Sequence, residues 1–102
     1  MNAQSITSKR TKNRLVIKIN DPVDIQNIKP VYDKLIKEKF DRSEIILEVN
    51  ENVSIDLSFI QLVLSLHKTH LEKNQKITLN APLNAMQKNV ILDTNTDIKI
   101  AT

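Results

Sequence analysis

Residues 44–61 of the chain, EIILEVNENVSIDLSFIQ, decide what the rest of the sequence can form. Glu44–Val49 are a near-continuous apolar run of strand length, of the kind found in a strand that is covered on both faces. The polar residues 50–52 turn the chain, and Val53–Ile55 form a short apolar alternation. Asp56–Ser58 then place capping residues before an apolar segment. The stretch therefore predicts a strand, a turn and a helix in quick succession.

The sequence continues this alternation toward the carboxyl terminus. The segment from Phe59 to Lys73 is apolar over a wide surface and becomes charged only at its end, so we expect a core helix. Lys76–Leu79 (KITL) predict a strand. Pro82 stands where it can begin another helix, because the first helical turn needs no proline N–H. Residues 98–100 indicate a final short strand.

The amino-terminal part adds a hairpin and a helix. Arg14–Ile19 (RLVIKI) are aliphatic and β-branched, and residues 5–9 can pair with them across a polar turn. Apolar residues then recur every three or four positions, which predicts an amphipathic helix. If this helix begins after Asn27 and runs to about Lys39, Pro30 falls in its first turn, where a missing N–H is tolerated. The alternating elements predict an α/β domain rather than a bundle or a sandwich.

Composition limits the domain count and excludes several kinds of chemistry. The 102 residues suffice for one domain, residues 1–102, with a formal net charge of +3. Without Cys there is no disulfide, thiol nucleophile or cysteine-ligated metal. Without Gly there is no phosphate-binding loop or nucleophile elbow. No apolar run approaches the roughly 18 residues that span a bilayer, and residues 1–10 lack an apolar signal segment, so we expect a cytoplasmic protein.

The order of motifs from Ile46 to Gln61 resembles a STAS domain, a family named for sulphate transporters and anti-sigma factor antagonists. Glu48 matches the acidic residue of the family's strand, Asp56 matches the aspartate of its Asp-Ser-Ser/Thr-Gly-Leu motif, and Ser58 matches the second hydroxyl residue. This resemblance implies a mixed sheet of four or five strands with helices packed mainly on one side.

Two further segments extend the resemblance to about residues 5–100. Val23–Ile25 resemble the Leu-Asp-Ile that precedes the family's first helix, and Lys76–Leu83 (KITLNAPL) resemble its next strand, polar loop and helix.

Two residues depart from the family pattern. Leu57 stands where partner-switching members carry a serine that a cognate kinase phosphorylates, so this position cannot be phosphorylated. Ser58 is the alternative candidate phosphorylation site. Phe59 replaces the motif glycine with a bulky side chain, which would change a partner surface built on that glycine.

The resemblance implies a non-enzymatic regulatory module that binds a protein. No cofactor or metal is expected, because the chain has no Cys and no third ligand near its histidines. The expected partner is an anti-sigma factor or a kinase with a GHKL-type ATPase domain, bound without a phosphorylation switch. The alternative is a soluble accessory subunit of a membrane ABC transporter ATPase. Leu57 and Phe59, if exposed at the helix start, would form an apolar patch suited to a partner. The expected partner-binding residues are Asp24, Asp56, Leu57, Ser58, Phe59 and Gln61.

The same acidic residues also allow simpler or different roles. Asp56 or Ser58 at a helix start can be no more than an N-cap. Asp21, Asp24 and Asp56 can converge at one end of a sheet, where open α/β folds bind ligands. A paired-carboxylate active site would also need an acid with a raised pKa, so an enzyme has no positive support in the sequence.

Two other groups of residues have ordinary structural explanations. His67 and His70, three residues apart on one helix, can supply two metal ligands, but no third is indicated, so we expect polar residues of a core helix. The basic residues within 9–14 have no aromatic neighbour that could stack on a base. We therefore expect a solvated turn there and no nucleic-acid partner.

Overall fold

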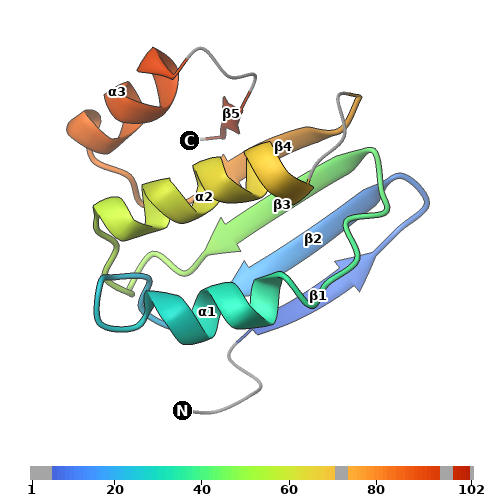
Figure 1. The fold of residues 1–102 in the computed structure, drawn as a ribbon, viewed down its shortest axis with the longest axis horizontal. Helices are drawn as coiled ribbons and strands as arrows, with labels where there is room; N and C mark the ends of the chain where they lie inside the picture. The colour runs from blue at the N-terminus through green and yellow to red at the C-terminus, as the bar shows by residue number, and fades with distance from the viewer. Residues whose placement is uncertain (1–5, 71–73, 95–97, 102) are drawn as a thin grey trace.

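The computed structural model describes residues 6–70, 74–94 and 98–101, with the side chain of His70 left out (Figure 1). Within these ranges strands and helices alternate, as the sequence predicts for an α/β domain. In chain order the elements are β1 (Ile6–Arg10), β2 (Arg14–Ile19), α1 (Ile28–Leu35), β3 (Glu44–Val49), α2 (Leu57–His70), β4 (Lys76–Asn80), α3 (Ala85–Asp93) and β5 (Lys99–Ile100).

The strands form one mixed sheet in the order β1-β2-β3-β4-β5. The hairpin of β1 and β2 is antiparallel, and β2, β3, β4 and β5 run parallel to one another. Helices α1 and α2 lie across the same face of the sheet, and α3 lies beside α2 near the β4 and β5 edge (Figure 1). The predicted fold class, an α/β mixed sheet of four or five strands, is confirmed. None of the described helices has the length and apolar character needed to cross a bilayer.

The central strand β3 is covered on one face only. Ile45, Leu47 and Val49 point toward the helices and are buried, whereas Ile46 and Glu48 on the opposite face are only half-buried. The expectation that both faces would be covered is therefore wrong. The apolar run was misleading because Ile46 adds one aliphatic residue to a face that is otherwise polar along this strand.

Helix α1 differs from its prediction at its end. Pro30 lies in the first turn, as expected. The helix ends at Leu35, four residues before the predicted Lys39. Asn27 occupies the N-cap position and makes no side-chain cap, and its Nδ2 donates to the Pro22 carbonyl oxygen at 2.8 Å.

Helix α3 begins at Ala85 rather than at Pro82. Asn84 Oδ1 accepts from the Gln87 amide at 2.8 Å, and Gln87 Oε1 accepts from the Asn84 amide at 3.0 Å. This reciprocal capping box satisfies two amides and fixes the helix start. The end of the predicted helix from Phe59 to Lys73 lies outside the described residues.

Candidate functional site

Strands β2, β3 and β4 end at the same edge of the sheet, and each is followed there by a segment that leads into a helix (Figure 1). Ligands of open α/β sheets bind at this carboxyl edge. The first two segments are joined by a parallel bridge between Val23 and Ile55. The Val23 amide donates to the Ser54 carbonyl oxygen at 2.9 Å, and the Asp56 amide donates back to Val23 at 3.4 Å.

Asp56 holds two of these segments together. Its Oδ1 accepts from the Ser58 amide at 2.8 Å, which caps α2, and its Oδ2 accepts from the Ile25 amide at 2.9 Å. The interpretation of Asp56 as an N-cap is confirmed. Partial burial raises the pKa of Asp56, but the hydrogen bonds from the Ile25 and Ser58 amides and the Ser58 hydroxyl outweigh it, so the pKa lies below its usual value. Asp56 is thus a carboxylate, the opposite of what a general acid requires.

Each of the three segments carries one large apolar side chain that is exposed. Ile25 is 71% exposed, Leu57 is 45% exposed and Met86, in the first turn of α3, is 60% exposed. Ile25 is bonded to Asp56 through its amide, and Leu57 follows Asp56 directly. The residue after Met86, Gln87, donates from Nε2 to the Ile55 carbonyl oxygen at 3.4 Å. We call Ile25, Leu57 and Met86 the carboxyl-edge surface.

The predicted partner contacts divide into exposed and buried residues. Leu57 and Gln61 are exposed and lie one helical turn apart on the same side of α2. Phe59 is fully buried in the core, so its expected exposure is wrong. It is on the face of α2 that packs on the sheet, together with Ile60 and Val63. A residue two positions from Leu57 points elsewhere on a helix, which explains why one is exposed and the other is not.

Ser58 is buried, with 9% of its surface exposed, and its amide donates to Asp56 Oδ1 at 2.8 Å. A kinase would have to extract the Ser58 hydroxyl from the start of α2, so the structure gives no support to Ser58 as a phosphorylation site. The residue contributes to the cap of α2 and offers a partner little surface.

Asp24 lies beside the carboxyl-edge surface and is half-buried. Its Oδ2 accepts from the Ser54 hydroxyl at 3.0 Å, which adds a second tie between the first two segments. Asp21 and Asp24 line a hollow of about 400 Å³ with Pro22, Gln26 and Asn27. The described residues contain no group of three side chains suited to hold a metal ion. The hollow lies next to Ile25, and two of its lining residues are acidic.

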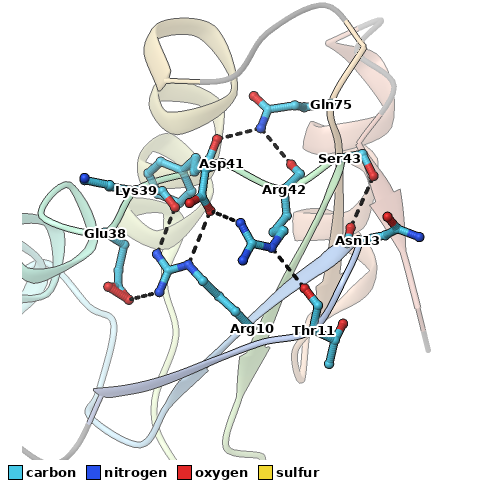
Figure 2. Close-up of polar contacts among 10 residues, drawn as sticks. Arg10, Thr11, Asn13, Glu38, Lys39, Asp41, Arg42, Ser43 and Gln75 are labelled. Carbon is cyan, nitrogen blue, oxygen red and sulfur yellow. Dashed lines mark hydrogen bonds and ion pairs between the residues drawn. The ribbon is translucent and has the colours of Figure 1, made fainter.

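The densest network of polar contacts lies at the opposite, amino end of the parallel strands (Figure 2). Arg10 donates from Nε to Asp41 Oδ1 at 3.3 Å and from Nη2 to the Lys39 carbonyl oxygen at 3.0 Å. Arg42 lies 3.0 Å from the same Asp41 oxygen and donates from Nε to the Thr11 carbonyl oxygen at 2.9 Å. These bonds tie the segment after α1 to the hairpin turn, so Arg10 is not part of a free basic patch.

Gln75 completes the amino-end network from the start of β4. Its Nε2 donates to the carbonyl oxygens of Phe40 and Arg42 at 2.6 and 2.7 Å (Figure 2). Partial burial raises the pKa of Asp41, but the hydrogen bond from Arg10 and the charges of Arg42 and Arg10 lower it below its usual value. The donors and acceptors of this network are used internally, which is the arrangement of a structural clamp.

The sequence predicted only one of the three residues of the carboxyl-edge surface, Leu57, and missed Ile25 and Met86. Ile25 lies in the turn before α1 and Met86 lies in the first turn of α3, and an apolar side chain at such a position usually joins the core. Their exposure depends on how the described segments pack together, which is a property of the assembled fold. The acidic residue Asp24 directly before Ile25 was a signal in the sequence that could have indicated an exposed position.

Comparison with known proteins gives no independent assignment. No family model, curated protein or solved structure matches this chain. The resemblance of the motifs to STAS domains stays a prediction, and the function has to be inferred from what the carboxyl-edge surface can bind.

Proposed function

We propose that this chain is a STAS-like regulatory module that binds another protein through its carboxyl-edge surface. The supporting observation is that each of three segments at the carboxyl edge of the sheet exposes one large apolar side chain. Single exposed apolar residues are ordinary, but apolar side chains gathered within a polar border are typical of protein interfaces. Ile25, Leu57 and Met86 supply the apolar centre, and Asp24 and Gln61 supply the border.

The surface is held in place without a covalent switch. Asp56 bonds the Ile25 amide and caps α2 at the same time, so the positions of Ile25 and Leu57 are fixed relative to one another. A preorganised surface loses less conformational freedom on binding. Because Leu57 occupies the place of the family's phosphorylated serine, binding is constitutive. The proposed partner is an anti-sigma factor or a GHKL-type kinase domain, and no catalytic step is proposed.

Introducing a negative charge into the apolar centre of the surface tests this proposal. The variants Ile25→Asp and Leu57→Asp should keep the fold, because both side chains are exposed, and each should weaken partner binding about thirtyfold, as expected for a central contact worth about 2 kcal/mol. Leu92→Asp is the matched control, since Leu92 is also an exposed aliphatic residue, at 65%, but lies near the far end of α3. Phe59→Asp is unsuitable because the buried charge would unfold the protein.

The measurement is affinity capture from the native host, followed by titration of the purified partner. A soluble GHKL-type ATPase or an anti-sigma factor lost from Leu57→Asp and kept by Leu92→Asp supports the proposal. A transporter ATPase recovered with membrane subunits would instead establish the alternative. Identical recovery by all three variants would show that the carboxyl-edge surface is not the docking site.

A further inference from the structure

Strand β1 forms an edge of the sheet in the described structure, with β2 as its neighbour. The Thr11 amide donates to the Arg14 carbonyl oxygen at 2.9 Å, which makes this a hydrogen-bonded pair of the hairpin. Bonded pairs alternate along an antiparallel ladder. The register therefore turns the N–H and C=O groups of Ile6, Ser8 and Arg10 away from β2 and toward the open edge. Such an edge is a template for an added strand.

Two hollows flank this edge, one on each face of the sheet. The first has a volume of about 350 Å³ and is lined by Thr7, Ser8, Lys9, Val16 and Lys18. The second has a volume of about 260 Å³ and is lined by Ile6, Thr7, Ser8, Lys34, Lys37 and Glu38. Successive side chains of an added strand point to opposite faces, so neighbouring residues of a bound segment would approach the two hollows in turn.

The charge of the hollows defines what they accept. Together they are lined by four lysines and one glutamate, and the Glu38 carboxylate lies 4.0 Å from the Arg10 guanidinium, which partly neutralises it. Lys9 and Lys18 are exposed, and such side chains leave their charged ends in water above the apolar Val16. The complementary ligand carries carboxylates that reach both faces of the sheet.

The backbone of the edge restricts the ligand further. The outward groups of β1 are both donors and acceptors, and a peptide backbone satisfies both, whereas the phosphates of a nucleic acid or a lipid surface only accept. A second copy of this chain is disfavoured, because β1 carries Lys9 and Arg10 and no acid, and pairing two copies would oppose like charges. We propose that the β1 edge binds an extended acidic segment of another protein by strand addition.

This second surface uses no residue of the carboxyl-edge surface, so the two proposals stand or fall separately. The probe is a blocked peptide of sequence Thr-Val-Glu-Glu-Val-Thr, titrated into the isotopically labelled full chain while the backbone amide resonances are followed. We expect saturable shifts centred on Ile6–Arg10 and slower hydrogen exchange at the Ser8 amide. The fully N-methylated peptide keeps its charges but donates no backbone hydrogen bonds, and should bind at least about tenfold more weakly.

Two variants test the backbone and the charges independently. Ser8→Pro removes an N–H that points to the open edge and leaves the bonds to β2 intact, as edge strands tolerate. It should weaken the peptide about fivefold or more, whereas Ser8→Val, which keeps the N–H, should not. The double variant Lys9→Glu with Lys18→Glu should abolish binding, and Lys88→Glu on α3 should leave it unchanged. Circular dichroism and thermal unfolding confirm that each variant folds.

Three results would overturn the proposal. The first is the absence of saturable shifts with the parent peptide. The second is equal affinity for the N-methylated peptide, which would mean attraction by charge alone. The third is binding of an anionic vesicle or a single-stranded oligonucleotide at β1 in the absence of peptide binding, which would assign the basic edge to a different class of partner.

Discussion

The two ends of the parallel strands use their polar side chains in different ways. At the amino end, Arg10, Asp41, Arg42 and Gln75 bond to one another and to loop carbonyl oxygens, and the result is a closed clamp. At the carboxyl end, Asp56 also ties segments together, but the residues around it leave large apolar side chains in water. The polar side chains of one end are therefore used internally, whereas the other end leaves apolar surface exposed.

One carboxylate at each end of the strands shows that similar side chains can have different structural roles. Asp41 and Asp56 are both hydrogen-bonded carboxylates with lowered pKa values. Asp41 is held by guanidinium groups, whereas Asp56 is held by backbone amides, so Asp56 fixes the path of the chain next to it. Fixing the chain is what brings Ile25 beside the start of α2.

The largest expected effect concerns Phe59 and Leu57, two neighbouring apolar residues at the carboxyl end. Phe59→Ala should lower the free energy of unfolding by about 3–5 kcal/mol, because it leaves a cavity in the core. Leu57→Ala should change it by less than about 0.5 kcal/mol, because Leu57 is partly exposed. Urea unfolding followed by circular dichroism measures both. Similar losses for the two variants would mean that Leu57 is a packing residue and that the carboxyl end has no spare apolar surface.

A smaller effect is expected from the amino-end clamp. Gln75→Ala should lower the free energy of unfolding by about 1–3 kcal/mol, because the carbonyl oxygens of Phe40 and Arg42 lose their donor in a site where Gln75 itself is 8% exposed. Gln61→Ala, on the exposed side of α2, is the matched control and should have almost no effect. A loss from Gln61→Ala as large as that from Gln75→Ala would contradict the assignment of stability to the amino end.

Most of the fold was predictable from sequence because periodicity reports which face of an element is buried. The hairpin, β3, β4 and the first turn of α1 follow from alternation and proline chemistry. The carboxyl end of α1 and the start of α3 were less predictable, and α3 begins late because Asn84 forms a capping box with Gln87. Side-chain hydrogen bonds of this kind leave little trace in a hydrophobic pattern.

The candidate site was predictable only in part. Asp56 was found because a cap has a local sequence signature. The predicted exposure of Phe59 was wrong because α2 is apolar over most of its circumference near its start. The hydrophobic pattern therefore does not identify the face of the helix that meets the sheet. Ile25 and Met86 were missed because their exposure depends on three segments that meet only in the folded chain.

The two carboxylates predict a modest dependence of stability on pH. Both have folded pKa values below their usual ones, so each contributes stability that is fully present above its unfolded pKa and is lost as the pH falls through its folded pKa. The free energy of unfolding should therefore decrease below about pH 4. Asp41→Asn and Asp56→Asn should each flatten this decrease, as measured by urea unfolding at a series of pH values. Asp33→Asn, for which no hydrogen bond or ion pair is recorded in the described structure, is the control and should leave the slope unchanged.

The smallest effect on the free energy of unfolding is expected at Arg14. This residue forms an ordinary surface ion pair at the same end of the sheet as the clamp, so the two can be compared. Arg14 Nε lies 2.8 Å from Glu44 Oε1, closer than Arg10 lies to Asp41, yet both side chains of the Arg14 pair are well exposed. Water screens such a pair, so Arg14→Gln should change the free energy of unfolding by less than about 0.5 kcal/mol. Arg10→Gln should cost more, because Arg10 also donates to the Lys39 carbonyl oxygen. If the two variants lost equal stability, the amino end would be held by surface charge pairs in general, and the clamp would have no special part in it.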